Sequence, residues 1–212
     1  DPFCFIFAPL ISNRVSVHHG KEIEELRLIR EGWRGQAAAW LEQMSGGFAV
    51  RRAKMILGVT QEIAEYERDT RAPGKEVGVY SNWVDLKQIA ILADNRLPDE
   101  LHVAFICGTF SEWHGLDKLI EAVDEYRFLP NDPPLTIHLI GKLSQPQIEQ
   151  LSASQNCANV CKHYGPLDEN SYMPILCKCD FGLTSFALER KGLGEASTLK
   201  VREMLAMGLP VY

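Results

Sequence analysis

Two glutamates near the end of the chain, Glu195 and Glu203, are separated by seven residues. A helix is predicted over residues 199–207, so its N-terminus lies between them. The first turn of a helix offers unpaired N–H groups and a partial positive charge, which suit a diphosphate. Ser197 or Thr198 could cap this helix, and a neighbouring carboxylate can accept hydrogen bonds from sugar hydroxyls. The alternative interpretation is that Glu195 is a loop charge and Glu203 a solvated helix residue.

The cysteines give little support for a metal site. Cys157 and Cys161 are separated by three residues, and Cys177 and Cys179 by one. Neither pair is followed by a matching second pair at zinc-knuckle spacing. The sequence also lacks an Asp-x-Asp motif. We therefore expect no metal and no other cofactor, and we expect reduced thiols in a cytoplasmic protein.

The composition is that of a soluble globular protein. Of the 212 residues, 46% are hydrophobic and 24% are charged, which is enough apolar material for a packed core. Disorder is therefore a poor explanation of the sequence. The formal net charge of −6 argues against nucleic acid as a partner. No apolar run reaches the length of a membrane span, and the N-terminus lacks the basic-then-apolar pattern of a signal peptide.

Strand-like and helix-like runs alternate along most of the chain, which predicts βαβ units and Rossmann-like, doubly wound parallel sheets. Strands are expected at 14–18, 55–59, 77–80, 102–107, 135–140, 159–164, 180–185 and 209–212. Helices are expected at 35–52, 60–68, 144–154, 170–177 and 199–207, and one more follows the apolar stripe Leu116, Leu119, Ile120 and Val123. Thr60 is the expected N-cap of its helix.

Doubly wound sheets bind ligands at the carboxyl ends of their strands. The candidate site is therefore assembled from the loops that follow the strands. These loops are residues 108–115, 141–143, 165–167 and 185–198.

Several segments resemble, in the same order, the retaining GT-B glycosyltransferases known as group 1 or family 4. The most specific is residues 195–211, which is similar to that family's Glu-(x)7-Glu region with its helix and following strand. The other similar segments are 53–60, the loop Ser81-Asn82-Trp83-Val84-Asp85, the glycine loop 108–117 and the strand 179–183. The resemblance covers about residues 14–212 and implies a fold of two Rossmann-like lobes.

The resemblance also implies how the chain is divided. Residues 1–80 would be the remnant of an N-terminal, acceptor-side lobe, and residues 81–100 the interdomain linker. Residues 101–212 would form a truncated C-terminal lobe that binds the nucleotide-sugar donor. The chain opens without a methionine and stops inside a predicted strand. We therefore expect a fragment whose N-terminal lobe is incomplete and which binds nucleotide weakly or is inactive by itself.

The resemblance implies roles for residues near the predicted helix at 199–207. Glu203 would bind the ribose hydroxyls of the nucleotide, and Glu195 would contact the transferred sugar. The phosphates would be held by the backbone amides of Ser197, Thr198 and Leu199. Lys200 would be the nearby cation.

Two further parts of the site follow from the same resemblance. Residues Gly165, Pro166 and Leu167 would pass close to the base. His19 would act in catalysis by facing the donor sugar from the other lobe, with His18 as the alternative. Either histidine could instead be a hydrogen-bonded structural residue.

The glycine loop departs from the family's pattern at two positions. The family often has an arginine after the first glycine, here Gly108, and a lysine before the next, both directed at the diphosphate. Thr109 and His114 occupy these positions. Histidine is charged only part of the time near neutral pH. Diphosphate binding would then depend on backbone amides and Lys200, or on Arg190 and Lys191.

The activity that the resemblance implies is transfer of a sugar from a nucleoside-diphosphate sugar to a hydroxyl, with retention of configuration. The protein would stabilise charge on the leaving diphosphate without a metal. No residue stands out as a covalent nucleophile, so front-face attack assisted by the leaving phosphate is the working hypothesis.

The expected partners are the nucleotide-sugar donor and a saccharide or lipid-linked acceptor, in envelope polysaccharide or glycoconjugate biosynthesis. The expected location is the cytoplasm or the inner face of the membrane, and any peripheral membrane association would come from parts outside this sequence. Two alternatives remain open because fold does not fix function. They are a non-catalytic nucleotide-binding module of the same fold and a GT-B-like sugar-nucleotide epimerase.

Overall fold

The computed structural model describes residues 13–30 and 32–212, which form two compact units. The first, here called the N-terminal lobe, contains the described residues up to Asn82 together with Glu189–Ser197. The second, the C-terminal lobe, contains Trp83–Leu188 and Thr198–Tyr212. This division differs from the predicted one, in which 81–100 is a linker and all of 101–212 is one lobe.

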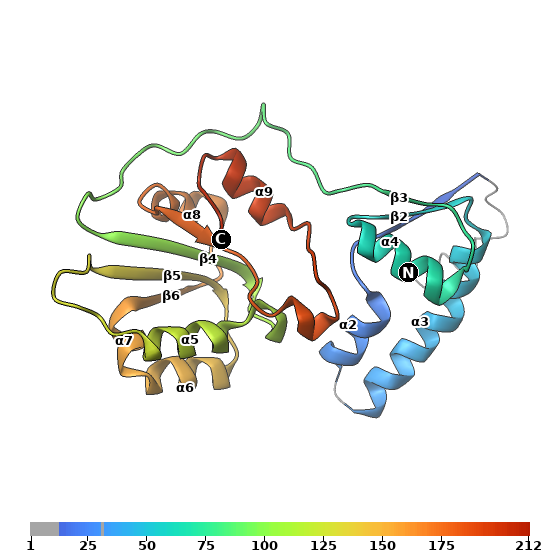
Figure 1. Cartoon of the computed structure of the whole chain (residues 1–212), viewed down its shortest axis with the longest axis horizontal. Helices are drawn as coiled ribbons and strands as arrows, with labels where there is room; N and C mark the ends of the chain where they lie inside the picture. Colours follow the sequence, from blue (N-terminus) through green and yellow to red (C-terminus); the bar gives the residue numbers. More distant parts are fainter. Residues whose placement is uncertain (1–12, 31) are drawn as a thin grey trace. The chain divides into compact units, whose positions relative to one another are not determined.

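The N-terminal lobe is built on a parallel sheet. In its described residues the sheet has three strands in the order β1-β2-β3 (Val15–His18, Met55–Gly58 and Val77–Val79). The helices are α2 (Glu22–Ile29), α3 (Trp33–Arg52) and α4 (Gln61–Arg71) (Figure 1). The predicted N-cap is confirmed, because the Thr60 side chain accepts a hydrogen bond from the backbone N–H of Ile63 at 3.3 Å.

The C-terminal lobe is built on a second parallel sheet, with the strand order β6-β5-β4-β7. The strands are Leu101–Thr109 (β4), Leu135–Lys142 (β5), Cys161–Gly165 (β6) and Phe181–Leu183 (β7). Helices cover both faces (Figure 1). On one face they are α5 (Leu116–Glu125), α6 (Gln145–Ala153) and α7 (Gln155–Val160), and on the other α8 (Glu169–Leu176) and α9 (Leu199–Ala206). The short 3-10 helix η1 (Glu112–His114) also belongs to this lobe, whereas a second, η2 (Leu188–Lys191), begins with its residue Leu188 and continues into the segment Glu189–Ser197 of the N-terminal lobe.

The alternation of side chains along β4 divides the core of the C-terminal lobe into two layers. Val103, Phe105 and Cys107 pack into the cluster that includes the buried face of α5. Ala104 and Ile106, which point the other way, pack with α8 and α9. A strand that is apolar on both faces is typical of a parallel sheet covered by helices on each side. The predicted fold class, Rossmann-like α/β with parallel sheets, is therefore confirmed.

Some elements differ from the prediction. Helix α2 was not predicted, and the expected strand at 159–164 begins only at Cys161. The Ser154 side chain accepts a hydrogen bond from the N–H of Cys157 and caps the short helix α7, which continues to Val160. Residues 210–212 run beside β7 and pair with it through the bridge between Gly182 and Val211. Within residues 13–30 and 32–212, no helix is both long and apolar enough to cross a membrane.

Candidate nucleotide-binding site

A pocket of about 150 Å³ lies in the C-terminal lobe, where β4, β5 and β6 end. Its position agrees with the rule that doubly wound sheets bind ligands at the carboxyl ends of their strands. The pocket is lined by residues of these strand ends and of the helices α8 and α9. They are Ile106, Cys107, Gly108, Ile140, Gly141, Pro166, Leu167, Tyr172, Leu176, Lys200, Glu203, Met204 and Met207.

The close approach of β4 and β5 forms one wall of the pocket. Gly141 has φ +141°, and a Cβ at this position would lie 1.8 Å from the carbonyl oxygen of Cys107. Only glycine fits this position. The end of β5 is held from β6 as well, because His163 Nε2 lies 2.9 Å from the carbonyl oxygen of Gly141. The packing thus fixes the backbone that lines the pocket.

Helix α9 supplies the two charged side chains of the pocket, Lys200 and Glu203. Burial lowers the pKa of the Lys200 ammonium, although the nearby Cys107 and Glu203 act in the opposite direction. Burial raises the pKa of the Cys107 thiol to about 12, so this cysteine is a neutral wall of the pocket at physiological pH. A half-buried ammonium beside a helix N-terminus is suited to an anionic ligand.

The first turn of α9 has no side-chain cap. Thr198 occupies the N-cap position, but its side chain makes no capping hydrogen bond. The carbonyl group of the preceding Ser197 accepts a hydrogen bond from Asn82 Nδ2 within the N-terminal lobe. The predicted cap by the Thr198 side chain is therefore not formed. Leu199, the first residue of α9, is 47% exposed.

The glycine loop places its predicted residues differently. Gly108 lines the pocket, and a Cβ there would meet no atom within 4 Å. Thr109, the last residue of β4, is exposed and pairs with Lys142 of β5. Neither Thr109 nor His114 is among the residues that line the pocket.

His114 has a structural position in the loop. Its Nδ1 accepts a hydrogen bond from the N–H of Ser111 at 2.9 Å, and the Ser111 side chain accepts one from the N–H of His114. Its ring lies against those of Phe110 and Trp113, with centroid distances of 6.1 and 5.7 Å. An imidazole that accepts at Nδ1 has its proton on Nε2 and is neutral in this arrangement. His114 therefore acts here as a cap rather than as a cationic clamp.

The segment after β6 supplies another part of the pocket lining. Pro166 and Leu167 line the pocket, whereas Gly165, with φ +70°, is the turn that precedes them. Tyr172 of α8 also lines the pocket and was not predicted. The sequence signal for it was limited to its place on a helix that begins just after the 165–167 loop.

The two predicted catalytic residues lie in the N-terminal lobe. His19 is exposed and follows β1, next to the buried His18. Glu195 is also exposed, and its Oε1 accepts a hydrogen bond from the N–H of Glu62 at 3.1 Å. The structure thus brings four predicted residues, Gly108, Leu167, Lys200 and Glu203, together in one pocket, and it places Glu195 and His19 in the other lobe.

The alternative phosphate cations, Arg190 and Lys191, belong to the segment Glu189–Ser197 of the N-terminal lobe. Lys191 Nζ lies 2.6 Å from Oε1 of Glu25, so its charge already has a carboxylate partner.

His18 is one member of a buried polar cluster that the sequence did not reveal. Its Nε2 lies 2.8 Å from the Ser16 hydroxyl, and its Nδ1 lies 3.3 Å from Glu22 and 3.5 Å from Glu67. These contacts give His18 a hydrogen-bonded structural position, which is one of the two possibilities that the sequence left open for it. The same contacts fix the end of β1, from which His19 projects.

Comparisons with known proteins find likeness at the level of structure. No protein-family model matches the chain, and no curated protein matches it in sequence. Sucrose-phosphate synthase from Thermosynechococcus elongatus matches 93% of this chain with a TM-score of 0.66 and 16% identity, over 49% of its own length. The lipopolysaccharide outer core galactosyltransferase WaaB matches 99% of this chain with a TM-score of 0.58 and 12% identity, over 58% of its length.

A third solved structure is HepE from Anabaena in complex with UDP and glucose. It matches 94% of this chain with a TM-score of 0.58 and 16% identity, over 52% of its own length. The chain thus spans about half the length of these structures. The likeness shows that the chain has the GT-B fold of two Rossmann-like lobes.

Proposed function

We propose that this chain is part of a glycosyltransferase that takes its sugar from a nucleoside-diphosphate donor. The observation that carries the proposal is the pocket at the strand ends of the C-terminal lobe, in which Lys200 and Glu203 project from the first two turns of α9. A carboxylate that can accept from ribose hydroxyls and a cation near a helix N-terminus match the two polar parts of a nucleotide. The solved complex of HepE with UDP and glucose supports the same class of ligand.

The proposed roles divide between the two lobes. Glu203 binds the ribose, and Lys200 and the first amides of α9 stabilise the charge that develops on the leaving diphosphate. Pro166, Leu167 and Tyr172 form the apolar side of the pocket and contact the base. Glu195 binds hydroxyls of the transferred sugar, and His19 acts beside it.

The finer features of the reaction belong to the same proposal. Transfer proceeds with retention, by front-face attack assisted by the leaving phosphate, as in the group 1 family that the sequence resembles. The acceptor is a saccharide or lipid-linked hydroxyl in envelope polysaccharide or glycoconjugate biosynthesis, at the cytoplasmic face of a membrane. Trapping of a covalent glycosyl–enzyme adduct would contradict the front-face step.

A non-catalytic nucleotide-binding module is the second candidate. It is favoured by the structural position of His114, which caps its own loop. The diphosphate would then have no cation at the loop position where the group 1 family often has a lysine. A donor that turns over only when an acceptor is present indicates the transferase, and turnover without acceptor indicates the epimerase. Binding without turnover by the complete protein indicates the module.

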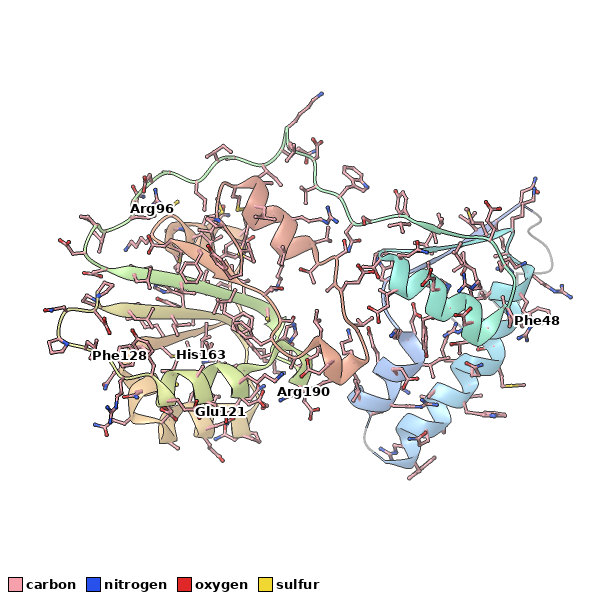
Figure 2. The ribbon with its side chains drawn as sticks, in the orientation of Figure 1. Phe48, Arg96, Glu121, Phe128, His163 and Arg190 are labelled. Atoms are coloured by element: carbon pink, nitrogen blue, oxygen red, sulfur yellow. The ribbon has the colours of Figure 1, made fainter. Side chains whose placement is uncertain are left out.

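The first test is calorimetric titration of the chain with UDP, GDP and ADP. We expect one of them to bind saturably, and Glu203→Ala to weaken binding about tenfold, which corresponds to about 1.4 kcal/mol. Glu121→Ala is the matched control, because Glu121 is an exposed glutamate of the same lobe on α5 (Figure 2). Absence of saturable binding for all three nucleotides would contradict the proposal.

A further inference from the structure

The segment Glu189–Ser197 is held in the N-terminal lobe by reciprocal hydrogen bonds between Glu62 and Glu195. The carboxylate of Glu62 accepts from the N–H of Gly194 at 2.8 Å and from the N–H of Glu195 at 3.2 Å. In return, the N–H of Glu62 donates to Oε1 of Glu195 at 3.1 Å. Each glutamate thus binds the backbone of the other across a sequence separation of 133 residues.

Lys21 completes this arrangement. Its Nζ donates to Oε1 of Glu62 at 2.8 Å and to the carbonyl oxygen of Gly192, and it lies 5.1 Å from the centre of the Tyr66 ring. Its side chain is only 12% exposed. Burial by itself would raise the pKa of the Glu62 carboxyl, but the hydrogen bonds from Lys21, Gly194 and Glu195 hold it below its ordinary value. Glu62 is therefore ionised and fully engaged at neutral pH.

The start of helix α4 explains why two carboxylates meet at this place. Glu62 is in the first turn of this helix, two residues after the N-cap Thr60. Its own N–H and the helix dipole favour a second anion there, and the Glu195 carboxylate occupies that position. The hydrogen bond engages only Oε1 of Glu195. Among residues 13–30 and 32–212, Oε2 has no hydrogen-bond partner, and the residue is exposed.

We propose that Glu62, with Lys21 as its counter-ion, is a positioning residue that fixes the backbone of Gly194 and Glu195 so that Glu195 presents Oε2 to the donor sugar. This inference rests on the proposed function, in which Glu195 binds sugar hydroxyls. Glu62 itself touches neither sugar nor nucleotide, and it acts through the loop. Its loss therefore affects recognition of the sugar and leaves the nucleotide pocket of the C-terminal lobe intact.

The test compares the affinities of the chain for UDP and for UDP-glucose by calorimetry, in the wild type and in Glu62→Ala. We expect Glu62→Ala to weaken UDP-glucose binding about tenfold, as for loss of one charge-assisted hydrogen bond, with UDP binding unchanged within about twofold. Glu62→Gln retains an acceptor for the two amides and is expected to restore part of the loss. Glu65→Ala, one turn along the same helix, is the matched control and is expected to change neither affinity.

Hydrogen exchange tests the structural premise separately. In Glu62→Ala the amides of Gly194 and Glu195 are expected to exchange faster, while those of α9 are unchanged. Equal loss of UDP and UDP-glucose binding, unchanged affinity for UDP-glucose, or unchanged exchange at these amides would each overturn the positioning role. Absence of UDP binding in the wild type would instead contradict a binding site for a uridine nucleotide donor. It would also contradict the positioning role of Glu62, which rests on that site.

Discussion

The two lobes fill their interiors with different chemistry. In the C-terminal lobe the core consists of two apolar layers, one on each face of β4, and one of these layers contains the fully buried Phe105 and Leu139. The N-terminal lobe has a small apolar cluster of Val50, Ile56 and Ala72. Next to this cluster, the N-terminal lobe buries charged side chains to a greater extent than the C-terminal lobe does.

The buried charges of the N-terminal lobe are Glu67, 0% exposed, and Arg71, 2% exposed. They lie 3.0 Å apart on α4, and Arg71 also contacts Glu42 at 3.0 Å. Burial raises the pKa of Glu67 to about 8, although Arg71 acts in the opposite direction and Glu22 in the same one. Desolvation therefore exceeds the attraction of the ion pair.

The buried histidines of the C-terminal lobe belong to a hydrogen-bonded chain instead. His102 Nδ1 lies 2.9 Å from His138 Nε2, and His138 Nδ1 lies 2.8 Å from the Tyr164 hydroxyl. His102 Nε2 lies 3.0 Å from Glu100. With Tyr164 donating to His138 and His138 to His102, every ring nitrogen of the two histidines has a hydrogen-bond partner. The comparison teaches that one lobe buries ionisable groups at a desolvation cost, whereas the other relies on apolar packing with hydrogen-bonded polar groups.

The largest effect is expected from a cavity in the apolar core. Phe105→Ala should lower the free energy of unfolding of the C-terminal lobe by about 3–5 kcal/mol, because it removes a fully buried ring from the apolar layer between β4 and α5. Hydrogen exchange, read separately for each lobe during urea titration, would measure it. A loss below about 1 kcal/mol would show that the apolar layers are not what stabilises this lobe.

Removal of one buried charge tests the other lobe. Arg71→Met leaves Glu67 buried without its cation and should destabilise the N-terminal lobe by about 3 kcal/mol at pH 8.5. The double variant Arg71→Met with Glu67→Met should recover much of this loss, since an apolar pair can replace a buried ion pair. If the double variant is as unstable as the single one, the loss comes from packing and not from the stranded charge.

A smaller effect is expected in the pH dependence of the N-terminal lobe. The raised pKa of Glu67 means that its neutral form is favoured in the folded state. The stabilisation that the neutral Glu67 side chain gives the folded state is complete below about pH 4.5 and is lost as the pH rises through about 8. Glu67→Gln should therefore gain stability over the wild type as the pH rises across this range. A constant difference between the two proteins in melting experiments would contradict the assignment.

The C-terminal lobe should respond to pH in the opposite direction. Burial, with His102, Lys162 and Lys178 nearby, lowers the pKa of His138 to about 4. The stability from the neutral ring is complete above about pH 6.5 and is lost as the pH falls toward 4. The wild-type lobe should lose stability over this interval, and His138→Gln should show a shallower slope. Two-dimensional NMR of the His138 ring would report its titration directly.

The smallest effect concerns two helix caps. Thr60→Ala removes the hydrogen bond to the N–H of Ile63 and should cost about 1 kcal/mol in the N-terminal lobe. Thr198→Ala is the matched change in the C-terminal lobe, where the N-cap side chain makes no capping hydrogen bond, and it should cost less than about 0.5 kcal/mol. Equal costs for both substitutions would show that the Thr60 hydrogen bond contributes nothing beyond the residue's intrinsic preference.

Local pattern carried much of the sequence prediction. The stripe of Leu116, Ile120 and Val123 is buried as expected on α5, and Thr60 caps α4, because both depend on residues within one or two turns. The position of the pocket at the strand ends followed from a general rule, since parallel strands bring their carboxyl ends to one edge, whereas Lys200 and Glu203 were expected there from the family resemblance. The predicted boundaries of helices and strands were less accurate. Ser154 caps the short helix α7, which extends into the strand expected at 159–164.

By itself, the sequence determined the α/β class, most of the strands and helices, and the strand-end pocket of the C-terminal lobe. Only the tertiary structure decided that Glu195 packs on the start of α4 with Glu62, and that His114 caps its loop. The same holds for the cluster of Glu67 and Arg71, which is spaced like an ordinary exposed helix pair. Periodicity reports neighbours along the chain, whereas burial and partner choice depend on residues that are distant in sequence and meet only in the folded lobe.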